Sequence, residues 1–217
     1  MKGSRMMFHA QRAGSALAAI AALAALSGCV SFGGKPPSQL LSLSAEQKVA
    51  PGAPRAAGSE GSLIVADPEA PRMLDTVRIP VQLSPTSVAY VAKVQWADTP
   101  RHLFQRLLSE TIAATTGRMV LDPGQYAGVP SQRLMGEIVD FSIDAQRNSA
   151  VVTFDAILAG PNGQVLAKQR FTATAPVSGK IDAATVGGPL NSAANRVAAD
   201  IAAWLATAGR QEPRAPE

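Results

Sequence analysis

The only cysteine in the sequence, Cys29, stands at the end of an N-terminal export segment, and this constrains the fold more than any other feature. Residues 1–28 begin with three basic residues and no acidic one, and continue with an apolar run from Ala13 to Leu26. This order is typical of a secretory signal peptide, and the run is too short for a transmembrane helix, which needs roughly 20 residues. A chain with one cysteine forms no internal disulfide, so the exported domain has to be stabilised by an ordinary hydrophobic core.

Cys29 also belongs to the most specific motif in the sequence. The residues Leu26-Ser27-Gly28-Cys29 resemble the lipobox, at which bacteria acylate a cysteine thiol and cut the chain before it. We therefore predict that residues 1–28 are removed and that the mature chain begins at Cys29, held to a membrane by lipid such as palmitate. Residues 29–38 are rich in Gly, Pro and Ser, which predicts a flexible tether. Ten residues reach at most about 35 Å.

The net charge of the mature chain excludes one class of partner. The whole sequence has a formal charge of +4, from 20 basic and 16 acidic residues. Removing Lys2, Arg5 and Arg12 leaves 17 basic and 16 acidic residues, so the mature chain carries about +1. A nucleic-acid-binding domain normally shows a basic stripe. No such stripe is present in the sequence, and we expect no nucleic-acid partner.

Four segments that follow the tether have the apolar density of β-strands: Gln39–Leu43, Ser62–Asp67, Val77–Leu83 and Ser87–Val94. Pro80 interrupts the third of them. Because proline cannot donate a ladder hydrogen bond, we expect this strand at a sheet edge or with a bulge. Residues 44–61 are rich in Ala, Pro and Gly, which predicts a long loop.

Two segments predict amphipathic helices. In Thr99–Thr116, Thr99 can cap the helix, Pro100 suits the first helical position, and Gly117 fits just past the end. The last predicted helix spans Pro189–Ala208, where apolar residues recur at helical spacing. Because Gly187-Gly188-Pro189 precedes it, we expect any helix upstream of Pro189 to be separate or kinked.

Between the two helices the apolar period changes to two, which predicts an antiparallel meander. Its strands are Gln132–Asp144, Ala150–Ala159 and Gln164–Ala173, and the last two are joined by Gly160-Pro161-Asn162-Gly163. Asn-Gly between alternating segments is a strong hairpin signal. In the first strand we expect one face to carry Met135, Val139, Phe141 and Ile143.

These elements predict one domain over residues 39–208, followed by a frayed tail at 209–217. The expected fold class is α+β: a mixed, mainly antiparallel sheet of about seven strands with two amphipathic helices packed on it. A mature length of 189 residues, from 217 minus 28, suits a single domain with its linkers.

Few residues of the mature chain are suited to catalysis or metal binding. His102 is its only histidine, and zinc and other transition-metal sites draw chiefly on His and Cys clusters. We expect the His102 side chain to be solvated or partly packed. The sequence has no nucleophile elbow, no phosphate-binding loop and no dinucleotide fingerprint. We therefore predict no catalytic, cofactor-binding or metal-binding residue, and assign only Cys29, as the lipidation site.

Two carboxylates are enough for glycoside hydrolysis, so the acidic residues need separate consideration. Six lie in or beside predicted strands: Asp67, Asp75, Glu137, Asp140, Asp144 and Asp155. Solvated strand faces carry acids at this frequency without any catalytic role, and that is the reading we adopt. Trp96 and Trp204 are expected to pack in the core or at a hinge rather than to form a ligand platform.

In the order of its motifs, the chain resembles the ABC-type transport auxiliary lipoproteins, which include the PqiC-like proteins. After the cysteine come a short strand at Leu41-Ser42-Leu43, a second at Leu63-Ile64-Val65, and the segment Pro71-Arg72-Met73-Leu74-Asp75. A tryptophan then leads into the first helix at Trp96-Ala97-Asp98, and a terminal helix follows the meander. The resemblance extends over roughly residues 29–208.

The resemblance implies a non-catalytic subunit of an envelope lipid-transport system. Such systems pair an inner-membrane ATPase and permease with an MCE-domain protein that crosses the periplasm, and the lipoprotein serves them from the outer membrane. Val30 agrees, because the sorting rule retains lipoproteins with Asp at that position in the inner membrane. Two alternatives stay open: an envelope enzyme such as a peptidoglycan hydrolase, and an assembly lipoprotein for an outer-membrane protein. Neighbouring genes that encode an ABC permease, its ATPase and an MCE-domain protein would favour the lipid-transport subunit over both alternatives.

Overall fold

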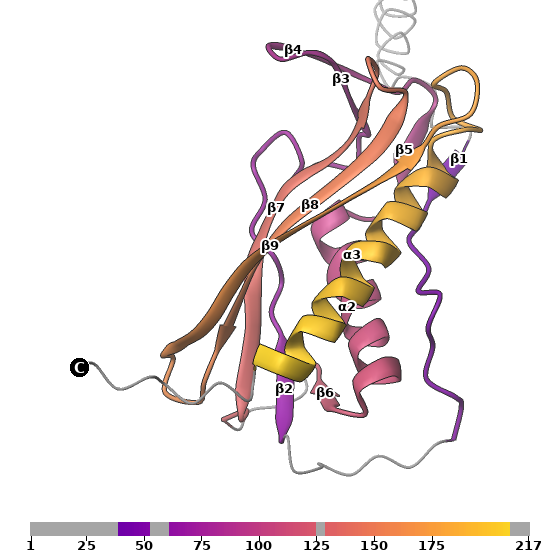
Figure 1. Cartoon of the computed structure of the whole chain (residues 1–217). Helices are drawn as coiled ribbons and strands as arrows, with labels where there is room; N and C mark the ends of the chain where they lie inside the picture. The colour runs from indigo at the N-terminus through magenta and orange to yellow at the C-terminus, as the bar shows by residue number, and fades with distance from the viewer. Residues whose placement is uncertain (1–38, 53–60, 125–128, 209–217) are drawn as a thin grey trace, which may run out of the picture. The chain divides into compact units, whose positions relative to one another are not determined.

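The computed structural model describes residues 39–52, 61–124 and 129–208. Within these ranges, one mixed sheet of seven strands is covered on one face by two helices (Figure 1). The predicted α+β fold class is confirmed. The prediction concerning residues 1–38, including Cys29, falls outside the described residues, as does that of the tail at 209–217.

The predicted antiparallel meander forms most of the sheet. Strands β7 (Gln132–Asp144) and β8 (Ser149–Ala159) pair along their whole length, and β9 (Val165–Pro176) pairs with β8. The predicted hairpin joins β8 to β9. Gly163 has a φ of 79° there, in the left-handed region that glycine adopts readily.

On the other side of β7 lie parallel strands, which make the sheet mixed. Strand β2 (Ser62–Val65) pairs with the beginning of β7, and β3 (Pro80–Ser84) pairs with its end. Strand β6 (Met119–Leu121) adds to β2, and β4 (Ser87–Tyr90) adds to β3 as an antiparallel hairpin. Because β7 has 13 residues, it is long enough to take two short partners one after the other along the same edge.

Strand β3 shows the second of the two expected alternatives, a bulge rather than an edge position. It lies between β4 and β7, so it is not an edge strand. A register irregularity between Gln82 and Ser84 supplies the expected bulge. Pro80 is the first residue of the strand, where a missing N–H is tolerated.

A separate parallel pair stands beside this end of the sheet. Strand β1 (Gln39–Leu41) pairs with β5 (Val94–Trp96), residue Gln39 lying opposite Val94. The backbone N–H of Ala97 donates to the carbonyl of Leu41, which continues the pairing by one residue. The segment predicted as one strand over 87–94 is therefore two strands, which belong to different sheets.

Helix α2 (Pro100–Thr116) has the predicted bounds but not the predicted cap. Gly117 ends the helix in the left-handed conformation, with a φ of 68°. Thr99 occupies the N-cap position, yet its hydroxyl makes no hydrogen bond to the helix. Its backbone N–H instead donates to Oδ1 of Asp98, at 2.7 Å.

Helix α3 (Gly187–Ala208) begins two residues before the predicted start at Pro189. Proline is tolerated in the first turn because the N–H groups of that turn have no intrahelical acceptor. The two glycines therefore extend the helix instead of interrupting it. Both helices pack on the sheet face that carries Val152, Phe154 and Phe171 (Figure 1).

The core-facing residues of β7 differ from the predicted ones. Leu134, Ile138, Phe141 and Ile143 are at most 1% exposed, whereas Met135 and Val139 are only half-buried. A register shift between Ile138 and Asp140 leaves Val139 as an extra residue. This bulge changes which alternate residues face the core. Phe141 and Ile143 were assigned correctly, and the placement of Met135 and Val139 on their face was wrong.

The predicted long loop is attached to both helices where the structure describes it. Backbone N–H groups of Ser44 and Glu46 donate to the side-chain carbonyls of Asn191 and Asn195, each at 2.8 Å. The Asn195 amide donates in turn to the carbonyl of Ser44, at 2.9 Å. Farther along, the N–H of Val49 donates to Oε1 of Glu110.

Replacing Asn195 with alanine should lower the free energy of unfolding by about 2 kcal/mol, because each buried polar group that loses its partner costs about 1–3 kcal/mol. Asn195 is 5% exposed and satisfies two backbone groups of the loop. Urea unfolding measures the change. The matched control is Asn191→Ala, which removes one loop bond in a more exposed position. A cost for Asn195→Ala no larger than that of the control would contradict this account.

Candidate functional site

The largest group of interacting charges in the described ranges lies at the N-terminus of α2. Arg101 and His102 occupy the first turn of the helix, and Asp98 precedes it. Arg101 lies 3.1 Å from Asp67, which follows β2, and 3.1 Å from Asp75. The cluster thus joins α2 to the segment that connects β2 with β3.

His102 lies between two carboxylates. Its Nε2 is 3.2 Å from Oδ2 of Asp67, and its Nδ1 is 3.0 Å from Oδ1 of Asp98. A neutral imidazole has one N–H, so only the doubly protonated ring donates to both. The His102 hydrogen bond is the main reason why the pKa of Asp98 lies below its usual value, followed by the backbone N–H of Thr99. The His102 side chain is 43% exposed, as a partly solvated group should be.

The cluster explains why the segment Pro71–Asp75 matters for the fold. Leu74 in this segment is fully buried, and its backbone N–H donates to the carbonyl of Pro71, which closes a turn. Asp75 then pairs with Arg101 on α2. In the part of the chain that the structure describes, no set of three or more His, Cys, Asp or Glu side chains is arranged to hold a metal ion. The ion pairs of Arg101 with Asp67 and Asp75 therefore hold this segment against α2, and we call this contact the latch.

The strand carboxylates lie on the sheet face that the helices leave open, and two of them have arginine partners. Asp155 on β8 receives two hydrogen bonds from Arg170 on β9, at 2.5 and 2.7 Å. Asp144 at the end of β7 pairs with Arg147 at 2.8 Å. Hydrogen bonds from Arg170 lower the pKa of Asp155, and those from the Arg147 backbone N–H lower the pKa of Asp144. Both carboxyl groups are therefore held ionised.

The other two strand acids differ from each other. Glu137 is exposed and lies opposite Asp155 in the β7–β8 register, so the structure does bring these two carboxylates together. Burial raises the pKa of Asp140, against the effect of hydrogen bonds from Ser142 and from the backbone N–H of Phe141. A glycosidase pairs an ionised carboxylate with a protonated one across the substrate. Here the neighbouring pair shares Arg170, and the acid with the raised pKa is a different residue.

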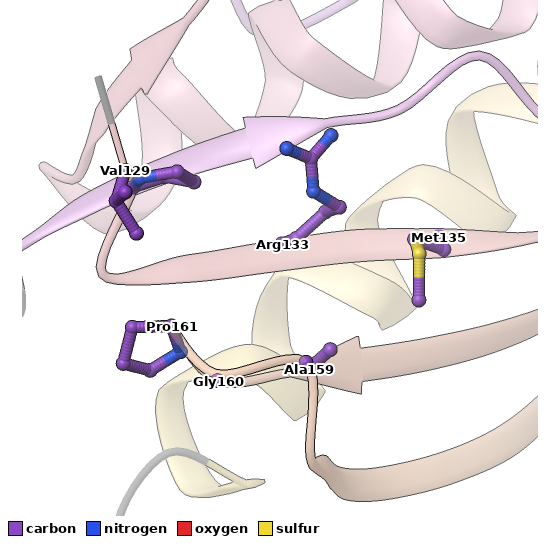
Figure 2. A pocket seen from close by; sticks show the side chains of 8 residues that line it. Val129, Arg133, Met135, Ala159, Gly160 and Pro161 are labelled. Carbon is purple, nitrogen blue, oxygen red and sulfur yellow. The ribbon is translucent and has the colours of Figure 1, made fainter.

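A pocket of about 360 Å³ lies at the end of the sheet where β7 begins (Figure 2). It is lined by Val129, Arg133 and Met135 on one side and by Ala159 and Pro161 of the β8–β9 hairpin on the other. Figure 2 shows the Arg133 side chain extending toward β2, away from Pro161. None of the lining residues is a carboxylate, hydroxyl or thiol. The pocket could not be found from the sequence, because its walls come from two separate segments that carry no motif.

Both tryptophans pack against phenylalanine rings, as expected. Trp96 is 1% exposed and meets Phe141 edge to face, with ring centroids 5.7 Å apart. Trp204 on α3 is half-buried and meets Phe171 of β9 at 5.6 Å. Trp96 thereby packs the end of β5, shortly before α2, against β7 of the sheet.

The sequence motif at Cys29 has no structural counterpart to compare, since it precedes the first described residue. Among the described helices, none is both long and apolar enough to span a bilayer.

Comparison with solved structures supports the fold. A Xanthomonas campestris protein of the DUF330 family aligns with a TM-score of 0.67 at 20% identity, over 79% of this chain and 97% of that one. A second crystal structure, of an uncharacterised protein, aligns with a TM-score of 0.60 at 16% identity, over 77% and 99% of the two chains. At these identities the likeness shows a shared fold. No curated protein matches the sequence significantly.

The family itself is shown by the sequence. A family model described as the ABC-type transport auxiliary lipoprotein component matches residues 41–202. The matched range begins in β1, contains Trp96 and the Asp75–Arg101 ion pair, and ends within α3. The resemblance drawn from the motifs is thereby confirmed. The chain belongs to the ABC-type transport auxiliary lipoprotein family.

Proposed function

We propose that this protein is an outer-membrane lipoprotein that acts in the periplasm as a non-catalytic auxiliary subunit of an ABC transporter of the MCE type, which moves phospholipid between the two membranes. The observation that carries the proposal is the family match over residues 41–202. The matched range includes the Asp75–Arg101 ion pair and the buried Trp96.

The proposed location follows from the N-terminal residues. A signal peptide ending in Leu26-Ser27-Gly28-Cys29 directs export and acylation. Val30 lacks the acidic side chain that retains lipoproteins in the inner membrane. Because the ten residues from Cys29 to Ser38 span at most about 35 Å, the domain works close to the membrane that holds it.

The charges of the domain support a binding role. The Arg101 and His102 cluster joins two segments of the chain, and Asp155 and Asp144 are paired with arginines of their own sheet. These groups are used within the fold, so a partner would meet a domain that is already rigid. A preorganised surface loses little conformational freedom on binding, as an auxiliary subunit requires.

A pull-down from detergent-solubilised membranes tests the proposed function. The chain, tagged after Glu217 and expressed at its native level, should co-purify with an MCE-domain protein and its ABC transporter. The control is an unrelated outer-membrane lipoprotein with the same tag. Recovery of the chain at normal level without any MCE-domain protein would refute the proposed partnership.

Single neutral substitutions of the strand carboxylates should leave envelope barrier function near normal. The variants are Glu137→Gln, Asp140→Asn, Asp144→Asn and Asp155→Asn, each tested for detergent sensitivity in a deletion strain. A catalytic carboxylate would be revealed by a large loss, since positioned acids and bases contribute about 10²- to 10⁴-fold. A variant that is present at normal level, binds its partner and still fails to complement would favour the hydrolase reading instead.

A further inference from the structure

The β3–β4 hairpin is exposed and yet carries no charge. Between Arg78 and Lys93, fourteen consecutive residues include no Asp, Glu, Lys, Arg or His. Leu83 and Val88, which flank the turn, are 46% and 38% exposed. Figure 1 shows the hairpin projecting beyond the paired part of β7. Exposed edge strands usually carry charged side chains that keep them in water, so this hairpin is suited to a less polar environment.

The geometry of the hairpin places its apolar groups outward. Gln82 pairs with Val88 and Ser84 with Ser87, so Leu83 is an extra residue without a strand partner. Among the strands that the structure describes, β4 pairs with β3 alone, so its other edge has no strand partner there. Backbone groups without a partner are costly in hydrocarbon but are readily satisfied among lipid headgroups. The hairpin is therefore suited to the interfacial layer of a bilayer rather than to its interior.

Cationic and aromatic side chains gather at the base of the hairpin. The guanidinium of Arg78 lies over the ring of Tyr90, 3.7 Å from its centroid. Lys93 and Lys180, together with Asp182, line a common pocket of about 460 Å³ next to it. Tyrosine is typical of the membrane–water interface, and basic residues there are attracted to anionic lipid. Three cationic side chains, those of Arg78, Lys93 and Lys180, outnumber the carboxylate of Asp182 at the base, and this excess of positive charge complements an anionic headgroup layer.

The N-terminal end of the domain lies beside the same base. Gln39, the first described residue, pairs with Val94. Val94 follows the hairpin closely, and the N–H of Val91 donates to the carbonyl of Ile79 across the base. Leu40, next to Gln39, is 61% exposed. A tether that spans at most about 35 Å between Cys29 and this point keeps this end of the domain near the bilayer.

We propose that the β3–β4 hairpin, together with Leu40, contacts the headgroup region of the bilayer that holds the acylated Cys29. This contact orients the domain, so that the opposite end, with the β8–β9 hairpin and the pocket of Figure 2, faces away from the membrane. The inference rests on the proposed acylation of Cys29, which brings the domain to the membrane.

Quenching of tryptophan fluorescence by brominated lipid tests the contact. The acylated full chain is purified in detergent, its lipid is confirmed by mass spectrometry, and it is reconstituted into vesicles of phosphatidylethanolamine and phosphatidylglycerol brominated near the headgroup. Leu83→Trp is compared with Val165→Trp, which replaces another exposed apolar residue at the opposite end of the domain. The unsubstituted protein provides the signal of Trp96 and Trp204.

The tryptophan of Leu83→Trp should be quenched at least about threefold more strongly than that of Val165→Trp, because interfacial segments lie within about 5–10 Å of the acyl boundary. Thermal unfolding of both variants verifies that they are folded. Equal quenching in protein that carries lipid would overturn the membrane contact. Absence of lipid by mass spectrometry would refute the proposed acylation, a separate result.

Discussion

Replacing Trp96 with alanine should lower the free energy of unfolding by about 3–5 kcal/mol, the usual cost of truncating a buried aromatic side chain to alanine. Trp96 is 1% exposed and packs edge to face on Phe141, which in turn contacts Phe104 of α2. Its removal leaves a cavity between the sheet, β5 and the start of the helix. Urea unfolding of residues 39–208, followed by circular dichroism, gives the change, and a domain of this size should unfold in one cooperative transition.

Two matched variants separate packing from hydrogen bonding in this prediction. Within the described residues the indole N–H of Trp96 has no hydrogen-bond partner, so Trp96→Phe loses volume but no hydrogen bond and should cost about 1–2 kcal/mol. Trp204→Ala removes a half-buried ring and should also cost about 1–2 kcal/mol. A cost for Trp96→Ala no greater than that of Trp204→Ala would show that Trp96 does not anchor the core.

The elements that were predicted correctly are those specified by local pattern. The helix over residues 100–116 follows from apolar spacing, Pro100 and Gly117, all of which act within a few residues. The β8–β9 hairpin follows from Asn162-Gly163 between alternating segments. The side-chain cap predicted at Thr99 does not form: the Thr99 hydroxyl makes no hydrogen bond to the helix, and the backbone N–H of Thr99 donates to Asp98.

The core face of β7 shows where periodicity stops being sufficient. Alternation gives one face only while each residue has one partner on the next strand. The bulge at Val139 breaks this condition, so Ile138 and Phe141, three residues apart, share the core face. No glycine or proline marks the bulge, since Val139 stands between Ile138 and Asp140.

The pairing of the strands was the part of the fold that the sequence predicted least well. The sequence predicts β2 and β3 as strands but cannot show that both pair in parallel with β7, since parallel pairing depends on distant segments. Strand β6, with only three residues, was missed; it adds to β2 after α2. Short strands carry too few alternations to be seen by pattern.

The charged cluster was equally hidden in the sequence. Asp67 and Asp75 are far from His102 in the sequence, and each of the three alone looks like an ordinary surface residue. The latch exists because β2 and the turn at Pro71–Asp75 are brought to the first turn of α2.

Replacing Cys29 with serine should reduce acylation to background and so remove the membrane anchor. The acyl acceptor in this motif is a thiol, and a thiolate is the reactive nucleophile of cysteine chemistry, whereas a serine hydroxyl does not take its place. The mature chain carries about +1 charge, which is too little to hold it to an anionic membrane, and residues 29–38 contain no second cysteine that could be acylated. Metabolic labelling with a palmitate analogue, followed by membrane fractionation, measures the effect.

The matched control is Ser27→Ala, which keeps a small residue before the cleavage site and should still be labelled. A Cys29→Ser variant labelled as strongly as the unsubstituted chain would refute acylation at this position, and with it the orientation of the β3–β4 hairpin toward the bilayer. Loss of label with normal co-purification of an MCE-domain protein would have a different meaning. It would show that the lipid determines where the domain works, and that the folded domain determines what it binds.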